Sequence, residues 1–285
     1  MWKKFFAFTT LSYFWTWSAL LYALRIYQSD LSASRFDNVV PWILVASFGP
    51  LIAGLVTVTV FDGPPKAKDL LRSAIRIRAP FWAYLVAILA PVLVAALAGM
   101  TFSASGIVPP IGVSEIGLFL AVSLAGVLPG LIGGPIGEEL GWRGVLFPTL
   151  LERFTPLTAA LVIAPVWASW HGPAFFMSEW RSGVPIATFV PIYLVSVTGL
   201  SMLLGAVKLR SPDSLVPAML GHSAHNTAQG ALVALGMSEV IAAEHASRMG
   251  WTIAILLLAA GFAALKIGTR ACVVSRSPAG SQAVL

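Results

Sequence analysis

The chain has 285 residues, of which 58% are hydrophobic and only 11% charged, and its mean hydropathy is +0.85. With so few charged residues, the chain lacks the polar surface that a water-soluble globular protein needs. It also contains ten Trp and 16 Phe residues, whereas disordered chains contain few aromatic residues. The formal charge of +6 does not indicate nucleic-acid binding, because the basic residues stand in short loops between apolar segments. The composition therefore predicts an integral membrane protein whose solvent is lipid.

Eight apolar segments are each long enough to cross a bilayer, which takes about 20 residues of helix. The expected fold is all-α and polytopic, with about eight transmembrane helices. We expect one membrane-embedded domain over residues 1–274 and a polar tail over 275–285. The eight segments cover residues 5–26, 39–61, 80–100, 116–142, 156–177, 185–207, 214–237 and 250–267.

Lysine and arginine divide unequally between the two sides that eight alternating spans define. One side carries 14 of them, and the other carries four: Arg25, Arg35, Arg181 and Arg248. Cytoplasmic loops are enriched in these residues, so we expect a cell-membrane (plasma or inner membrane) protein with both termini in the cytoplasm. Residues 66–78 interleave apolar and basic side chains, which fits either a short helix on the membrane surface or a solvated loop. The single Cys272 cannot form an internal disulfide.

The fourth segment carries the adjacent glutamates Glu138 and Glu139. A carboxylate inside the hydrocarbon region costs about 3 kcal/mol, so buried glutamates need partners or a function. The alternative is that the segment ends at Gly137 and that both glutamates are interfacial. Glu139 and Arg143 stand at positions i and i+4 and can form an ion pair, which leaves Glu138 free for chemistry.

Residues 129–137, just before the glutamates, are rich in glycine and proline. A broken helix at membrane depth survives where protein or trapped water satisfies the freed backbone groups. Gly130 and Gly134 also stand at the spacing that brings two helices close together. The segment therefore predicts a helix break, close helix packing, or both.

The fifth and seventh segments carry polar residues within apolar runs. His171 lies in the fifth, and His222 and Asn226 share one face of the seventh, with His225 on a neighbouring face. A lone histidine in a membrane is otherwise a hydrogen-bonded packing residue. Because these residues and Glu138 fall within the same ~30 Å slab, we expect a catalytic cavity among helices four to seven.

These residues form three motifs on separate segments, and together they resemble the CPBP intramembrane proteases. That family includes type II CAAX prenyl endopeptidases and bacteriocin-processing and self-immunity proteins. The resemblance covers residues 116–235 and implies about eight helices around a cavity open to the cytoplasm. Trp167 stands where the family often has Phe. The motifs are Glu-Glu-x-x-x-Arg at Glu138, Glu139 and Arg143, aromatic-x-x-x-His at Trp167 and His171, and His-x-x-x-Asn at His222 and Asn226.

Peptide hydrolysis needs an activated water, oxyanion stabilisation and a donor for the leaving amine, and these side chains can supply all three. We expect Glu138 to act as the general base with help from His171. His222 and Asn226 are expected to donate hydrogen bonds to the oxyanion. Glu139 and Arg143 are expected to form a structural ion pair. The resemblance thus implies an endopeptidase that uses glutamate-activated water.

The sequence is compatible with hydrolysis with or without a divalent metal ion. Glu138, His171 and His222 have the number and types of ligands of a catalytic zinc site, although no His-Glu-x-x-His motif is present and a metal-free mechanism would use the same side chains. The expected partners are the bilayer and a peptide or protein substrate, lipid-modified or not. Two rival functions are a proton-coupled transporter and a catalytically silent immunity or scaffold protein of the same fold.

Overall fold

The computed structural model describes residues 1–104, 112–232 and 243–276, and these residues form helices and their connections without any strand. The expected all-α class is therefore confirmed. The α-helices are α1 (Trp2–Ser29), α2 (Val40–Ser47), α3 (Gly49–Asp62), α4 (Pro64–Ser73), α5 (Phe81–Ala104), α6 (Val113–Ala125), α7 (Val127–Gly130), α8 (Pro135–Gly141), α9 (Phe147–Leu151), α10 (Pro156–Trp170), α11 (Ile186–Arg210), α12 (Val216–Leu232) and α13 (Ala243–Arg276). Short 3₁₀ turns are η1 (Asp37–Val39), η2 (Leu131–Gly133), η4 (Gly172–Phe176) and η5 (Glu179–Arg181), and η3 (Trp142–Leu146) is a π-helix.

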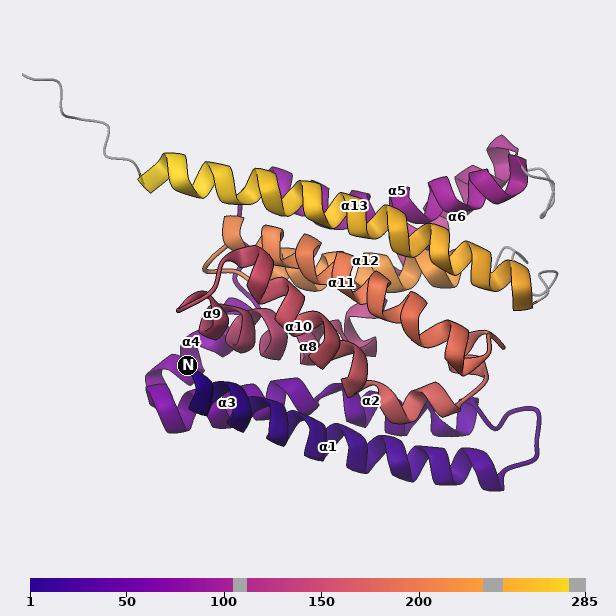
Figure 1. Cartoon of the computed structure of the whole chain (residues 1–285), viewed down its shortest axis with the longest axis horizontal. Helices are drawn as coiled ribbons and strands as arrows, with labels where there is room; N and C mark the ends of the chain where they lie inside the picture. The colour runs from indigo at the N-terminus through magenta and orange to yellow at the C-terminus, as the bar shows by residue number, and fades with distance from the viewer. Residues whose placement is uncertain (105–111, 233–242, 277–285) are drawn as a thin grey trace, which may run out of the picture.

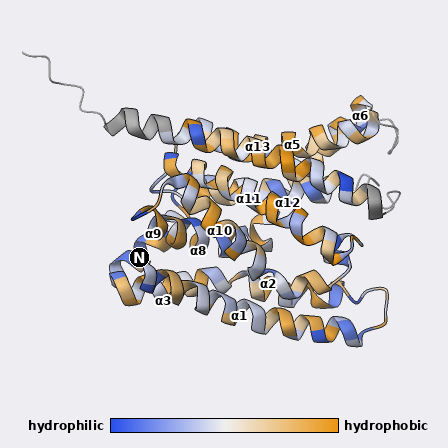
Figure 2. Cartoon of the chain, viewed as in Figure 1, coloured by the Kyte–Doolittle hydropathy of each residue, from blue (hydrophilic) through white to orange (hydrophobic). Residues whose placement is uncertain are grey.

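The helices stack in layers with their long axes roughly aligned (Figure 1). Helices α1 to α3 line one long face and α5, α6 and α13 the opposite one, with α8 to α12 between them. Helix α11 packs against α13, α12 against α5, and α3 against α8. Figure 2 shows hydrophobic residues along most of the helices, and among them Phe14, Val60 and Ile255 are exposed. An apolar outer surface of this kind suits lipid as the surrounding solvent.

Four stretches of helix in the described residues are long and apolar enough to cross a membrane: Asp37–Asp62, Phe81–Ala104, Ile186–Arg210 and Ala246–Thr269. Helix α6 with the turn that follows it, up to Gly133, passes the same test as a bent pair. The expected count of eight is not confirmed. Helix α12 shows one reason, because it has 17 residues and carries two histidines, an asparagine and a glutamine.

The fourth expected span, residues 116–142, is not one helix. It is divided into α6, α7, η2 and α8, with a 44° bend between the first two parts. Gly134 has φ +136°, a conformation that residues with a side chain rarely adopt, and α8 begins directly after it. At Gly130, an added Cβ would lie 2.6 Å from the Ser223 hydroxyl on α12. The sequence therefore encodes both the break and the close packing, at different glycines.

The structure also shows the basic segment after Gly63 and the end of the fifth expected span. The basic segment after Gly63 is a helix, α4, which buries Leu70. The fifth expected span, residues 156–177, ends as an α-helix at Trp170, and His171 begins the turn that follows it. The end of the seventh expected span, residues 233–237, and nearly all of the predicted polar tail lie outside the described residues.

Candidate active site

Helix α8 carries both glutamates into the protein interior. Glu138 is 5% exposed and Glu139 is fully buried, so protein encloses both carboxylates. The helix lies directly on the connection between α2 and α3 because two of its positions lack side chains. An added Cβ at Gly137 would lie 2.3 Å from the Ser47 carbonyl oxygen, and one at Gly141 would lie 2.6 Å from that of Pro50. This close approach fixes the position of Glu138.

Trp167 on α10 connects two of the predicted catalytic residues. Its indole Nε1 donates a hydrogen bond of 2.6 Å to Oε2 of Glu138. Its backbone carbonyl lies 3.0 Å from Nδ1 of His171. No described residue donates to Oε1 of Glu138, so that oxygen is left for another partner. The sequence motif identified Trp167 only as an aromatic residue and did not predict its role as a hydrogen-bond donor.

His171 has a defined tautomer because its Nδ1 faces a carbonyl oxygen, which can only accept. Nδ1 must carry the hydrogen, and in the neutral ring Nε2 is then an acceptor. Aromatic rings surround the imidazole: the ring centroids of Trp170, Trp180 and Tyr193 lie 4.5, 5.8 and 5.4 Å from that of His171. These contacts hold the ring in one orientation.

Glu139 has two partners, of which the sequence predicted one. Arg143 donates to its Oε1 over 3.1 Å, which confirms the expected i, i+4 ion pair. The same oxygen accepts a hydrogen bond of 2.9 Å from Nδ1 of His222 on α12. The Arg143 guanidinium also lies 4.4 Å from the centroid of the Trp167 ring. Glu139 therefore fixes the orientation of His222, in addition to its role within its own helix.

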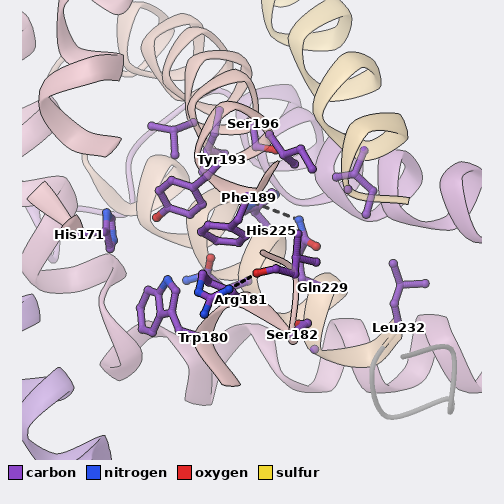
Figure 3. Close-up of a pocket in the computed structure, with 18 of the residues that line it drawn as sticks. His171, Trp180, Arg181, Ser182, Phe189, Tyr193, Ser196, His225, Gln229 and Leu232 are labelled. Atoms are coloured by element: carbon purple, nitrogen blue, oxygen red, sulfur yellow. Dashed lines mark hydrogen bonds between the residues drawn. The ribbon is translucent and has the colours of Figure 1, made fainter. Parts of the chain in front are cut away.

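One cavity of about 530 Å³ brings the predicted residues together. Glu138, His171, His222 and Asn226 all line it, although they come from α8, the end of α10 and α12. Asn226 makes no side-chain hydrogen bond to a described residue. The expected cavity is thus present, and Figure 3 shows the part of its lining around His171.

The cavity has polar lining residues that the sequence did not single out for chemistry. His225, expected on a neighbouring face, lines the same cavity, and its Nε2 lies 3.4 Å from Nε2 of Gln229. Tyr193 on α11 also lines it and points its hydroxyl toward His171 (Figure 3). Tyr193 stands in an apolar helix without a motif, so only the contact of its ring with His171 reveals it.

Three of the cavity residues have side chains that can bind a metal ion. Glu138, His171 and His222 are suitable ligand types, but within the described part of the chain no three His, Cys, Asp or Glu side chains come together as ligands of one ion. The Glu138 carboxylate is instead bound by the Trp167 indole. The arrangement of these residues does not fit a metal site, which is one of the two alternatives that the sequence leaves open.

The cavity extends toward one end of the bundle. Among its lining residues, Glu179 and Ser182 are exposed and lie on the connection between α10 and α11. That connection contacts the α1–α2 connection, where Arg35 pairs with Glu179 at 3.0 Å. The charge pattern of the sequence predicts that this end lies on the non-cytoplasmic side. The cytoplasmic termini and the cavity open to the cytoplasm, both expected from the sequence, stay predictions.

Comparison with known proteins identifies the segment that holds these residues. Residues 120–228 match the family model described as type II CAAX prenyl endopeptidase Rce1-like. CAAX prenyl protease 2 of Methanococcus maripaludis is 38% identical over 42 residues, which is 15% of this chain and 16% of that relative. The chain thus spans about a sixth of the curated relative it matches. The matched segment contains Glu138, His171, His222 and Asn226, and the resemblance drawn from the three motifs is confirmed: residues 120–228 are similar to the Rce1-like type II CAAX prenyl endopeptidases.

Proposed function

We propose that this protein is an intramembrane endopeptidase that hydrolyses peptide bonds with a water molecule activated by Glu138. The observation that carries the proposal is the convergence of Glu138, His171, His222 and Asn226 on one cavity. The cavity volume of about 530 Å³ lies in the range of ligand pockets, roughly 300–1,000 Å³. The match of residues 120–228 to the family model of type II CAAX prenyl endopeptidases supports the same conclusion.

Glu138 is the proposed general base. Trp167 occupies its Oε2, so Oε1 is the oxygen that accepts a proton from the attacking water. His171 orients that water through Nε2, because its Nδ1 is bound to the Trp167 carbonyl. As the proton moves to Glu138, the water oxygen forms a bond to the carbonyl carbon of the substrate. General base catalysis of this kind contributes about 10²–10⁴ in rate.

His222 and Asn226 are the proposed donors to the tetrahedral oxyanion, each worth about 10²–10³ in rate. His222 donates from Nε2 while Nδ1 stays bound to Glu139, whose carboxylate supplies the counter-charge. The Asn226 amide donates from the next turn of α12. Glu138 then returns its proton to the leaving nitrogen as the C–N bond breaks. The products are an amine and a carboxylic acid, which loses its proton to water, and Glu138 is restored as a carboxylate.

A cleavage assay tests this proposal. Purified wild type, Glu138→Ala and His222→Ala are incubated with prenylated CAAX peptides and with unmodified apolar peptides. We expect the wild type to cleave at least one class and both variants to lose about 100-fold or more in rate. Proton-linked uptake into liposomes without any cleavage would instead establish the transporter. Chelation followed by metal analysis of the same sample separates the metal-free mechanism from a zinc mechanism.

A further inference from the structure

Tyr193 on α11 combines a tightly packed ring with a hydroxyl at the candidate site. Its ring centroid lies 5.2 Å from that of Phe175 and 5.4 Å from that of Phe189. The His171 imidazole packs against the same ring at 5.4 Å. Tyr193 lines the cavity, and its hydroxyl points toward His171 (Figure 3). The neighbouring rings therefore fix the direction of the hydroxyl.

Other tyrosines show how a hydroxyl is bonded when it supports the fold. Tyr13 donates to the Val166 carbonyl over 2.6 Å, and Tyr84 donates to the Ile77 carbonyl over 2.5 Å. Tyr193 is only partly exposed, yet its hydroxyl makes no hydrogen bond to a residue that the structure describes. A polar group in an apolar wall costs free energy unless it is hydrogen bonded. The hydroxyl is therefore suited to a partner that enters the cavity.

The attacking water of the proposed mechanism leaves room for one more hydrogen bond. A water molecule can donate two hydrogen bonds and accept two. Its two hydrogens face Oε1 of Glu138 and Nε2 of His171, and one lone pair attacks the peptide carbon. The second lone pair can accept a hydrogen bond, and a tyrosine hydroxyl can donate one. We propose that Tyr193 is a further catalytic residue, whose hydroxyl donates a hydrogen bond to the attacking water.

This inference rests on the proposed function and adds an orienting contact to it. The water oxygen gains negative charge as its proton moves to Glu138, and a donor already in place stabilises that charge. With its other positions occupied, the water also aims its remaining lone pair at the carbonyl carbon. In this arrangement Tyr193 contacts the water and not the peptide. Loss of the hydroxyl should therefore lower kcat without changing the affinity for the substrate.

Trp180 carries the competing donor near His171. Its ring centroid lies 5.8 Å from that of the imidazole, and it lines the same cavity. Its indole N–H can donate a hydrogen bond but cannot accept one. The Tyr193 ring lies closer to the imidazole, at 5.4 Å, and its hydroxyl points toward His171 (Figure 3). These two observations favour Tyr193 as the donor.

The test compares purified wild type and Tyr193→Phe in the cleavage assay. The variant keeps the packed ring and loses only the hydroxyl, so its unfolding temperature should stay close to that of wild type. We expect kcat to fall by about tenfold or more, with KM unchanged. Tyr84→Phe is the matched control, because it also loses one hydroxyl but lies outside the cavity lining, and it should keep kcat. Trp180→Phe should lose less than Tyr193→Phe.

Peptide binding to the Glu138→Gln variant measures affinity separately from cleavage. Addition of Tyr193→Phe to this variant should leave the dissociation constant of the peptide unchanged. A weaker dissociation constant, or a raised KM with unchanged kcat, overturns the inference, because the hydroxyl would then bind the peptide.

The cleavage rates separate the remaining outcomes. A kcat of well-folded Tyr193→Phe within about threefold of wild type overturns the inference and leaves the proposed function standing. A larger loss in Trp180→Phe than in Tyr193→Phe also overturns it and assigns the donor to the indole. If wild type cleaves none of the peptides, the proposed function fails, and this inference fails with it.

Discussion

The Oε1 atom of Glu139 lies 2.9 Å from Nδ1 of His222, although 83 residues separate them in the chain. The same oxygen accepts a hydrogen bond from Arg143. Of the two adjacent glutamates, Glu139 thus orients a histidine and balances a buried guanidinium, while Glu138 faces the cavity. This division of roles leads to separate expectations for the two residues.

Glu139→Ala should destabilise the protein strongly. It leaves the fully buried Arg143 without its counter-charge, and breaking a buried ion pair in this way costs about 3–5 kcal/mol. Glu139→Gln, which keeps an acceptor oxygen, should lose less. Thermal unfolding in detergent measures both variants. Asp69→Asn is the control, because its pair with Arg72 is exposed and contributes about 1 kcal/mol or less. Equal losses for Asp69→Asn and Glu139→Ala would contradict the assigned role.

Trp167→Phe should remain folded and active. The variant loses the hydrogen bond to Glu138 but keeps an aromatic ring between Arg143 and His222. We expect its cleavage rate to stay within about tenfold of wild type, since one hydrogen bond to a charged group is worth roughly 1.5–3 kcal/mol and part of it is replaced by water. Trp167→Ala removes the ring and should lower stability by about 3–5 kcal/mol. Inactive but stable Trp167→Phe would show that the indole N–H itself is required.

The contact between α8 and the α2–α3 connection predicts a steric requirement at Gly137. An added methyl group would lie 2.3 Å from the Ser47 carbonyl oxygen, so Gly137→Ala must displace the helix that carries Glu138. We expect activity to fall by about 100-fold, as misplacement by about 1 Å does elsewhere. Gly117→Ala on α6, where nothing lies within 4 Å of the new atom, is the matched control. Comparable rates for the two variants would contradict the close packing.

Helical spacing made part of this site predictable. The Glu139–Arg143 pair follows from an i, i+4 relation, and the break before Glu138 follows from glycine and proline content. The cluster of polar residues on α12 was visible as an interruption in an apolar run. Each of these signals is local, so one sequence suffices to find it.

The contacts between distant segments could not be predicted in the same way. No spacing rule relates Glu139 to His222. The residues next to Trp167 in the sequence likewise do not indicate that its indole N–H faces Glu138. The end of α10 before His171 had a signal in the sequence that was given less weight than hydropathy. Gly172 and Pro173 follow directly, and both residue types disfavour the continuation of an α-helix. An apolar run reports burial in lipid, but it does not report where a helix ends.

The cluster of Tyr27, Arg35, Ser178 and Glu179 should give a pH-dependent contribution to stability. Burial acts to raise the pKa of Glu179, but hydrogen bonds from Tyr27, Ser178 and Arg35 outweigh it and lower the pKa to about 2. A lowered carboxyl pKa stabilises the folded state above the usual value of about 4.5, and this contribution is lost as the pH falls toward 2. The difference in unfolding temperature between wild type and Glu179→Gln should therefore shrink from pH 5 to pH 3. A difference independent of pH would contradict the assignment.

The central claim is that Glu138 activates the water that cleaves the peptide. The most direct test compares initial cleavage rates of purified wild type and Glu138→Gln, an isosteric change that keeps the acceptor for the Trp167 indole. We predict a loss of about 100-fold or more in rate with an unfolding temperature close to that of wild type. Cleavage by well-folded Glu138→Gln at a rate within about threefold of wild type, far less than general base catalysis contributes, would contradict the mechanism.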